Sequence, residues 1–178
     1  MISIFNYAFA GFALFGPVAY SSFASAQVPV SRPEAAQPGS AVTSSASMAA
    51  VRAALNACAG SNIAIAIIDP SGAPKLIFVP DGTAGQMGDL ARRKANTALR
   101  FARPSSETRD LAKGDQQLAA KISGDASLAA FGGGLYLSKE GRSLGALAVA
   151  GAKAQADDER CAAAGVAALG TQVHDLAK

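Results

Sequence analysis

The most unusual chemical group in this 178-residue sequence is a lysine in the middle of an apolar helix face. The pattern of residues 87–102 predicts a helix. At 100° per residue, Met87 and Leu90 lie on one apolar arc, and Lys94 falls at its centre. Its ammonium either extends past the edge of this arc or is held by an anionic partner, because few lysines are buried unpaired. Both interpretations stay open on the sequence.

Arginines occupy the opposite face of the same predicted helix. Arg92 and Arg93 begin this set, which continues with Asn96, Arg100 and Arg103. Such a face is most often only solvated, and its functional alternative is a patch that binds carboxylates or phosphates. This helix is therefore the part of the sequence best suited to an anionic small ligand.

Groups that could catalyse a reaction or hold a metal are scarce elsewhere. The single histidine, His174, lies on the predicted surface side of the last helix, and no Cys and His spacing fits a zinc site. The glycine run 132–134 precedes a strand, unlike a dinucleotide-binding motif. The acidic run 157–159 is explained by the positive end of a helix dipole. Cys58 and Cys161 are either a disulfide pair or two buried thiols.

The N-terminal residues differ sharply from the rest of the chain. Residues 1–26 have no charged side chain, hold seven of the eleven aromatic residues and end in Ala24-Ser25-Ala26. This pattern is typical of a secretory signal peptide, with an uncleaved anchor as the alternative. Residues 27–46 are rich in Pro, Ser and Ala and are predicted to be a flexible linker, which leaves residues 47–178 as one domain. We therefore expect a periplasmic or secreted protein with no membrane attachment after cleavage.

The domain is predicted to be α+β, with an antiparallel sheet made of two β-hairpins and flanked by helices in the order α-β-β-α-α-β-β-α. The expected elements are helix 47–59, strands 62–69 and 75–79, helices 87–102 and 105–122 (with a weak point at Gly114), strands 135–138 and 143–150, and helix 157–177. Alternation puts Ala64 and Ala66 of the first strand on one face, and Ala146, Ala148 and Ala150 of the last strand likewise share a face. A helix, another subunit or a flat ligand could cover this face, and a helix is favoured. A net charge of +3 and few aromatic residues in the domain argue against nucleic acid.

Four stretches in this order resemble the GlcG/HbpS family of small haem-binding proteins, also found as the C-terminal domain of PduO-type proteins. They are IAIAIIDPSG at 63–72, ARRKANTALRF at 91–101 with Pro104-Ser105, GGL at 133–135, and GRSLGALAVAG at 141–151 leading to DERCAAAG at 158–165. Within the second stretch, Lys94 matches the recurrent Lys-Ala-x-x-Ala lysine of the family's central helix. The resemblance implies the fold and an oligomeric haem binder or sensor outside the cytoplasm.

We therefore expect an exported protein that binds haem, or a similar flat anionic tetrapyrrole, for uptake, storage or sensing. Lys94, Arg92 and Arg93 are the cations expected for the propionates, and Met87 and Tyr136 are candidate contacts, with no axial ligand singled out. One alternative is a non-catalytic assembly module without haem that uses the alanine faces to form a homo-oligomer. Another is an enzyme acting on a small organic acid, with Lys94 and Asp69 as acid and base.

Overall fold

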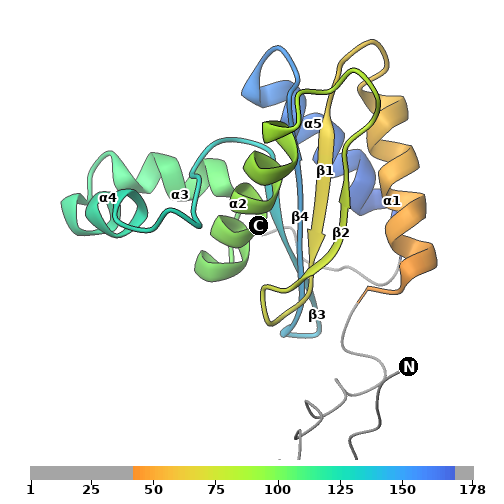
Figure 1. Cartoon of the computed structure of the whole chain (residues 1–178). Coiled ribbons are helices and arrows are strands. Elements are labelled where there is room, and N and C mark those ends of the chain that lie inside the picture. Colours follow the sequence, from red (N-terminus) through yellow and green to blue (C-terminus); the bar gives the residue numbers. More distant parts are fainter. Residues whose placement is uncertain (1–41, 171–178) are drawn as a thin grey trace, which may run out of the picture. The chain divides into compact units, whose positions relative to one another are not determined.

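The computed structural model describes residues 42–170, which form five helices and one antiparallel sheet (Figure 1). The elements in chain order are α1 (Ser44–Ala57), β1 (Ala64–Ile68), β2 (Pro74–Phe78), α2 (Gln86–Phe101), α3 (Ser105–Ala112), α4 (Gln116–Ser123), β3 (Gly134–Lys139), β4 (Arg142–Ala150) and α5 (Gln155–Ala168). The strands lie in the order β2-β1-β4-β3, and every neighbouring pair is antiparallel. The α+β fold and the order of its elements are therefore as predicted.

Three predicted helices have bounds in the structure that differ by more than one residue. The helix expected over 47–59 is α1, Ser44–Ala57, so residues 44–46 of the predicted linker are helical. The helix expected over 105–122 is two helices, because Gly114 interrupts it and Asp115 starts a new one by accepting hydrogen bonds from the N–H groups of Gln117 and Leu118. The last helix ends at Ala168 instead of continuing to 177. Residues 1–41 and 171–178, which hold the predicted leader, most of the linker and His174, lie outside the described residues.

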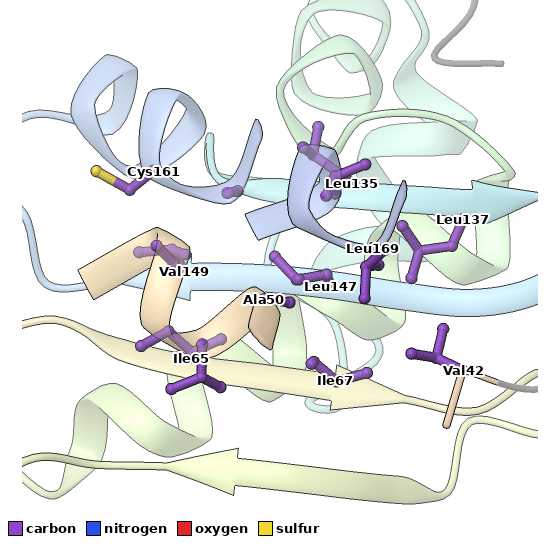
Figure 2. Packing of buried hydrophobic residues seen from close by; sticks show 14 of the residues in the cluster. Val42, Ala50, Ile65, Ile67, Leu135, Leu137, Leu147, Val149, Cys161 and Leu169 are labelled. Carbon is purple, nitrogen blue, oxygen red and sulfur yellow. The ribbon is translucent and has the colours of Figure 1, made fainter. Parts of the chain in front are cut away.

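The sheet has one large hydrophobic face and one alanine face. Ile65, Ile67, Leu147 and Val149 point toward α1 and α5 and form the main core with them (Figure 2). This face carries the bulky side chains because two helices must be packed against it. Within residues 42–170, none of the helices has the length and apolar character needed to cross a membrane.

Helix α2 covers the alanine face. Ala91, Ala95 and Ala98 of α2 pack on small residues of β1 and β4, namely Ala66, Ala146, Ala148 and Ala150. Small side chains on both surfaces let the helix lie close to the strands, since the distance between packed elements depends on the side chains at the contact. The favoured interpretation of the alanine face is confirmed. The proposal that the alanine faces form an oligomer interface is wrong, because they are already buried within the chain.

A disulfide joins the two helices of the other face. Cys58, at the C-terminal end of α1, is bonded to Cys161 of α5, with a Cα–Cα distance of 5.7 Å and both side chains buried. This distance is ordinary for a disulfide. Of the two alternatives left open by the sequence, the structure has the paired cysteines.

Candidate functional site

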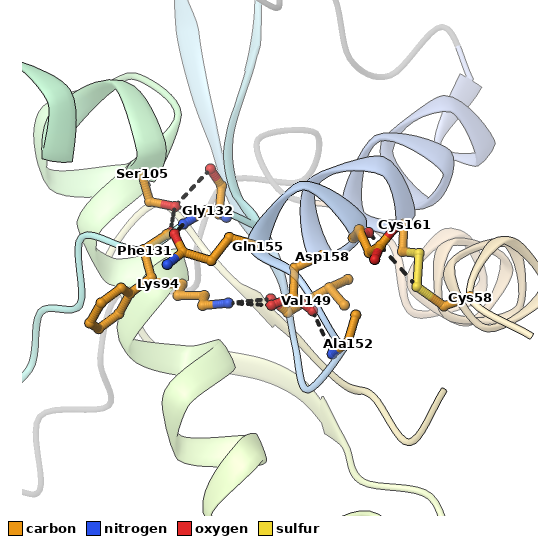
Figure 3. A network of polar contacts seen from close by, with 12 residues as sticks. Cys58, Lys94, Ser105, Phe131, Gly132, Val149, Ala152, Gln155, Asp158 and Cys161 are labelled. Atoms are coloured by element: carbon orange, nitrogen blue, oxygen red, sulfur yellow. Dashed lines mark hydrogen bonds and ion pairs between the residues drawn. A yellow bond between two sulfur atoms is a disulfide. The ribbon is translucent and has the colours of Figure 1, made fainter. Parts of the chain in front are cut away.

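Lys94 is fully buried in α2, and its ammonium is held by two partners. Its Nζ donates to Asp158 Oδ2 at 2.7 Å and to the carbonyl oxygen of Val149 at 3.1 Å (Figure 3). Only 2 % of Lys94 and 4 % of Asp158 are exposed, so the pair is shielded from water. Of the two interpretations of Lys94, the structure shows the anionic partner. That partner is Asp158 and not Asp69.

Asp158 connects Lys94 to the segment between β4 and α5. Its Oδ1 accepts a hydrogen bond from the N–H of Ala152 at 2.9 Å, while its Oδ2 faces the lysine (Figure 3). The acidic residues 157–159 were explained from the sequence by the helix dipole alone, which did not predict that Asp158 would be the buried partner of Lys94. The signal was present, because positions 158, 161, 162 and 165 follow the i, i+3, i+4, i+7 spacing of a buried helix stripe, and all four are buried.

The glycine run 132–134 allows three elements to meet beside this ion pair. A Cβ on Gly133 would lie 2.5 Å from the carbonyl oxygen of Val149, and one on Gly134 would lie 2.5 Å from that of Lys94. Gly134 N–H also donates to Ser105 Oγ at 2.8 Å. No side chain fits at either position, so the run is explained by close backbone packing.

A pocket of about 280 Å³ opens next to the ion pair. Its walls come from α2 and from the segment leading into α5, and its lining residues are Met87, Leu90, Lys94, Phe131, Gly151, Ala152, Lys153, Ala154, Gln155 and Asp158. Phe131 is 49 % exposed, and Lys153, also exposed, has no ion-pair partner within the described residues. The pocket therefore combines apolar walls, a thioether and one exposed cation.

Of the five predicted ligand contacts, the structure brings Met87 and Lys94 together in this pocket. Arg92 pairs with Asp89 at 2.7 Å on the surface of α2. Tyr136 lies on β3 opposite Ala146 and packs in a separate cluster with Leu99. The participation of all five residues in ligand binding, including that of Arg93, stays a prediction.

The arginine face of α2 is largely a support for the chain after α4. Arg93 Nη2 donates to the carbonyl oxygen of Leu128 at 2.8 Å, and Asn96 donates to that of Ser127 at 3.2 Å. Arg100 pairs with Asp125 at 3.1 Å. The two roles predicted for this face from the sequence were contact with solvent and binding of an anionic ligand. The structure adds a third role, because Arg93 and Asn96 donate to backbone carbonyls of residues 127–128 and Arg100 pairs with the carboxylate of Asp125.

Asp69 lies away from Lys94, in the turn after β1. Because β1 is antiparallel to β4, Ala64 lies opposite Ala150 near Lys94, and Asp69 follows the other end of the strand. Burial raises the pKa of Asp69, but hydrogen bonds from Ser71 and Ala73 outweigh it and hold the pKa below its usual value. Lys94 and Asp69 therefore do not form the acid and base of an enzyme site.

A larger pocket, of about 570 Å³, lies between α3 and α5 and contains none of the predicted ligand contacts. Of its three acidic side chains, Glu107 pairs with Arg103 and Asp110 pairs with Arg109 and Lys113, while Glu159 accepts a hydrogen bond from Ser106. In the described residues, no group of three or more His, Cys, Asp or Glu side chains is arranged to hold a metal ion. The smaller pocket is the better candidate site.

Comparison with known proteins gives a family and a set of similar structures. Residues 42–167 match the model of the family described as haem degrading protein HbpS-like. A double mutant of HbpS from Streptomyces reticuli is 32 % identical over 80 % of this chain and 99 % of that one, with a TM-score of 0.66. The PduOC:heme complex is 22 % identical over 76 % of this chain and 99 % of that one, with a TM-score of 0.69, a likeness that concerns the fold. A comparison with curated proteins finds no match.

Proposed function

The chain belongs to the HbpS-like family, and on that premise we propose that it binds haem in the pocket between α2 and the start of α5. The observation that carries the proposal is the combination of groups in this pocket. Leu90, Phe131 and Ala152 offer apolar surface, and Lys153 offers an exposed cation beside it. An apolar cleft with a few well-placed polar groups is the usual form of a cofactor site.

These residues fit a haem that is partly enclosed by the pocket. The pocket volume of about 280 Å³ is near the lower end for small-molecule sites, so part of a macrocycle would remain outside it. The exposed ring of Phe131 extends the apolar surface beyond the pocket. Lys153 is placed to pair with a propionate, whereas the ammonium of Lys94 is already bound to Asp158. Bound haem would supply iron chemistry, and the protein's part is to bind and orient it.

The proposal is tested by hemin titration of two matched variants, followed by absorbance. Ala154→Trp fills the proposed pocket, and Ala163→Trp fills the larger pocket; both alanines are exposed, so neither change disturbs the core. We expect the first variant to bind hemin at least about tenfold more weakly and the second to bind normally. The opposite pattern would move the site to the larger pocket, and absence of binding by the unsubstituted protein would refute the function. Degradation of haem, which the family description names, would appear as loss of the absorbance band with time.

We also propose that the protein acts outside the cytoplasm, as a homo-oligomer, in haem uptake, storage or sensing. The Cys58–Cys161 disulfide supports export, because such bonds persist in oxidising compartments. The sequence of residues 1–26 supports removal of a leader between Ala26 and Gln27. The intact mass of exported protein tests the cleavage, and light scattering tests the oligomer. A mass that retains residues 1–26 would favour an anchored form.

A further inference from the structure

We propose that the thioether sulfur of Met87 is the protein ligand of haem iron, an assignment that rests on the proposed function. Met87 lies in the first turn of α2 and lines the pocket. Its side chain is partly buried and packs with Leu90 against the alanine cluster formed by Ala66, Ala91 and Ala150. Met87 is therefore part of the pocket wall that would face a bound macrocycle.

The other side chains within residues 42–170 that could bind haem iron are either bonded to another group or distant from the pocket. Proteins bind haem iron mainly through His, Met, Cys thiolate or Tyr. Residues 42–170 contain no histidine, and their two cysteines, Cys58 and Cys161, are bonded to each other. Tyr136 packs against a different buried cluster, which includes Ala98 and Ala146. Among the donors within these residues, Met87 is the one that lines the pocket.

The chemistry of a thioether suits this site. Sulfur of methionine is neutral, so burial in an apolar wall costs little, and it needs no deprotonation to bind iron. Methionine ligation raises the reduction potential of haem relative to histidine ligation. The cation Lys153 at the pocket edge acts in the same direction, because positive charge disfavours the ferric state. We therefore expect a haem that is held more readily in the ferrous state.

The test compares Met87→Leu with Met48→Leu in the full chain loaded with hemin. Both changes conserve volume, so neither should prevent folding, and Met48 lies on α1, on the other side of the sheet. We expect Met87→Leu to lose the sulfur-to-iron charge-transfer band, to shift the spin state and to bind hemin at least about tenfold more weakly. Met48→Leu should keep the original spectrum and affinity. Met87→His should restore hemin affinity, with a spectrum typical of histidine ligation and a lower reduction potential.

Three outcomes would overturn the assignment. An unchanged spectrum in Met87→Leu would remove Met87 as the ligand while leaving haem binding intact. A changed spectrum in His174→Ala, with Met87→Leu unaffected, would assign the iron to the histidine outside the described residues. Failure of the unsubstituted protein to bind hemin would refute the proposed function, and the assignment with it.

Discussion

Replacing Lys94 by methionine should destabilise this protein strongly, because it leaves a buried carboxylate without its counter-ion. Methionine keeps most of the apolar stem and removes the ammonium. Among its contacts with residues 42–170, the carboxylate of Asp158, 4 % exposed, would then retain only the hydrogen bond from Ala152. Breaking a buried ion pair from one side costs about 3–5 kcal/mol. Since small domains have a total stability of about 5–15 kcal/mol, this is a large share of the free energy of unfolding.

The assay is urea unfolding of a double-mutant cycle. Lys94→Met alone should lose about 3–5 kcal/mol and lower the melting temperature by roughly 10–20 °C. Asp158→Asn alone should also destabilise, because it leaves the buried ammonium with neutral partners. The double variant should recover at least about 1 kcal/mol relative to the sum of the two losses, since neither charge is then stranded.

The control is Lys153→Met, which removes an exposed lysine from the same pocket. It has no ion-pair partner within the described residues, so its effect on stability should be within about 0.5 kcal/mol. A loss of less than about 1 kcal/mol in Lys94→Met, or losses that simply add in the double variant, would refute the reasoning. Either result would mean that the ion pair contributes little in solution.

Three further predictions concern the disulfide, the close backbone packing at Gly145 and the turn that contains Asp69. Replacing Cys58 and Cys161 together by alanine should cost about 2–5 kcal/mol in urea unfolding, and the native protein should show no free thiol on denaturation without reductant. Gly145→Ala should destabilise far more than Gly141→Ala: both glycines have positive φ, but only at Gly145 would the Cβ meet a backbone carbonyl, at 2.0 Å. For Asp69, burial raises the pKa but the hydrogen bonds of its turn lower it further. The stability of the unsubstituted protein relative to Asp69→Asn should therefore be fully present above about pH 5 and be lost as the pH falls through the lowered folded value.

The sequence predicted the fold well because its patterns are local. Alternating isoleucine and alanine in β1 defined a strand buried on both faces, and the alanine face correctly indicated a covering helix. Gly114 marked the break between α3 and α4. The end of α5 was placed too far along, because apolar residues continue past Ala168 and only Gly170, at positive φ, marks the stop.

The candidate site was only partly predictable, because its partners are distant in the sequence. An apolar arc around Lys94 showed that its ammonium needed a partner, but nothing local indicated Asp158, 64 residues away. The periodicity of α5 could have indicated that carboxylate as a buried position. The support given by Arg93 to the carbonyl of Leu128 had no sequence signal, since an arginine face looks the same whether it meets solvent or a loop.

Magnitudes decide which lysine of the pocket can serve an anionic ligand. A propionate that drew the Lys94 ammonium away would gain a charge-assisted hydrogen bond, about 1.5–3 kcal/mol. It would also strand Asp158 in a buried site, at a cost of about 3–5 kcal/mol. The exchange is unfavourable, so Lys94 should remain with Asp158 while Lys153, which has no such partner within residues 42–170, meets the ligand. On this argument, Lys94 positions the segment between Gly151 and Asp158 that forms the pocket wall, and its loss weakens hemin binding only through that segment.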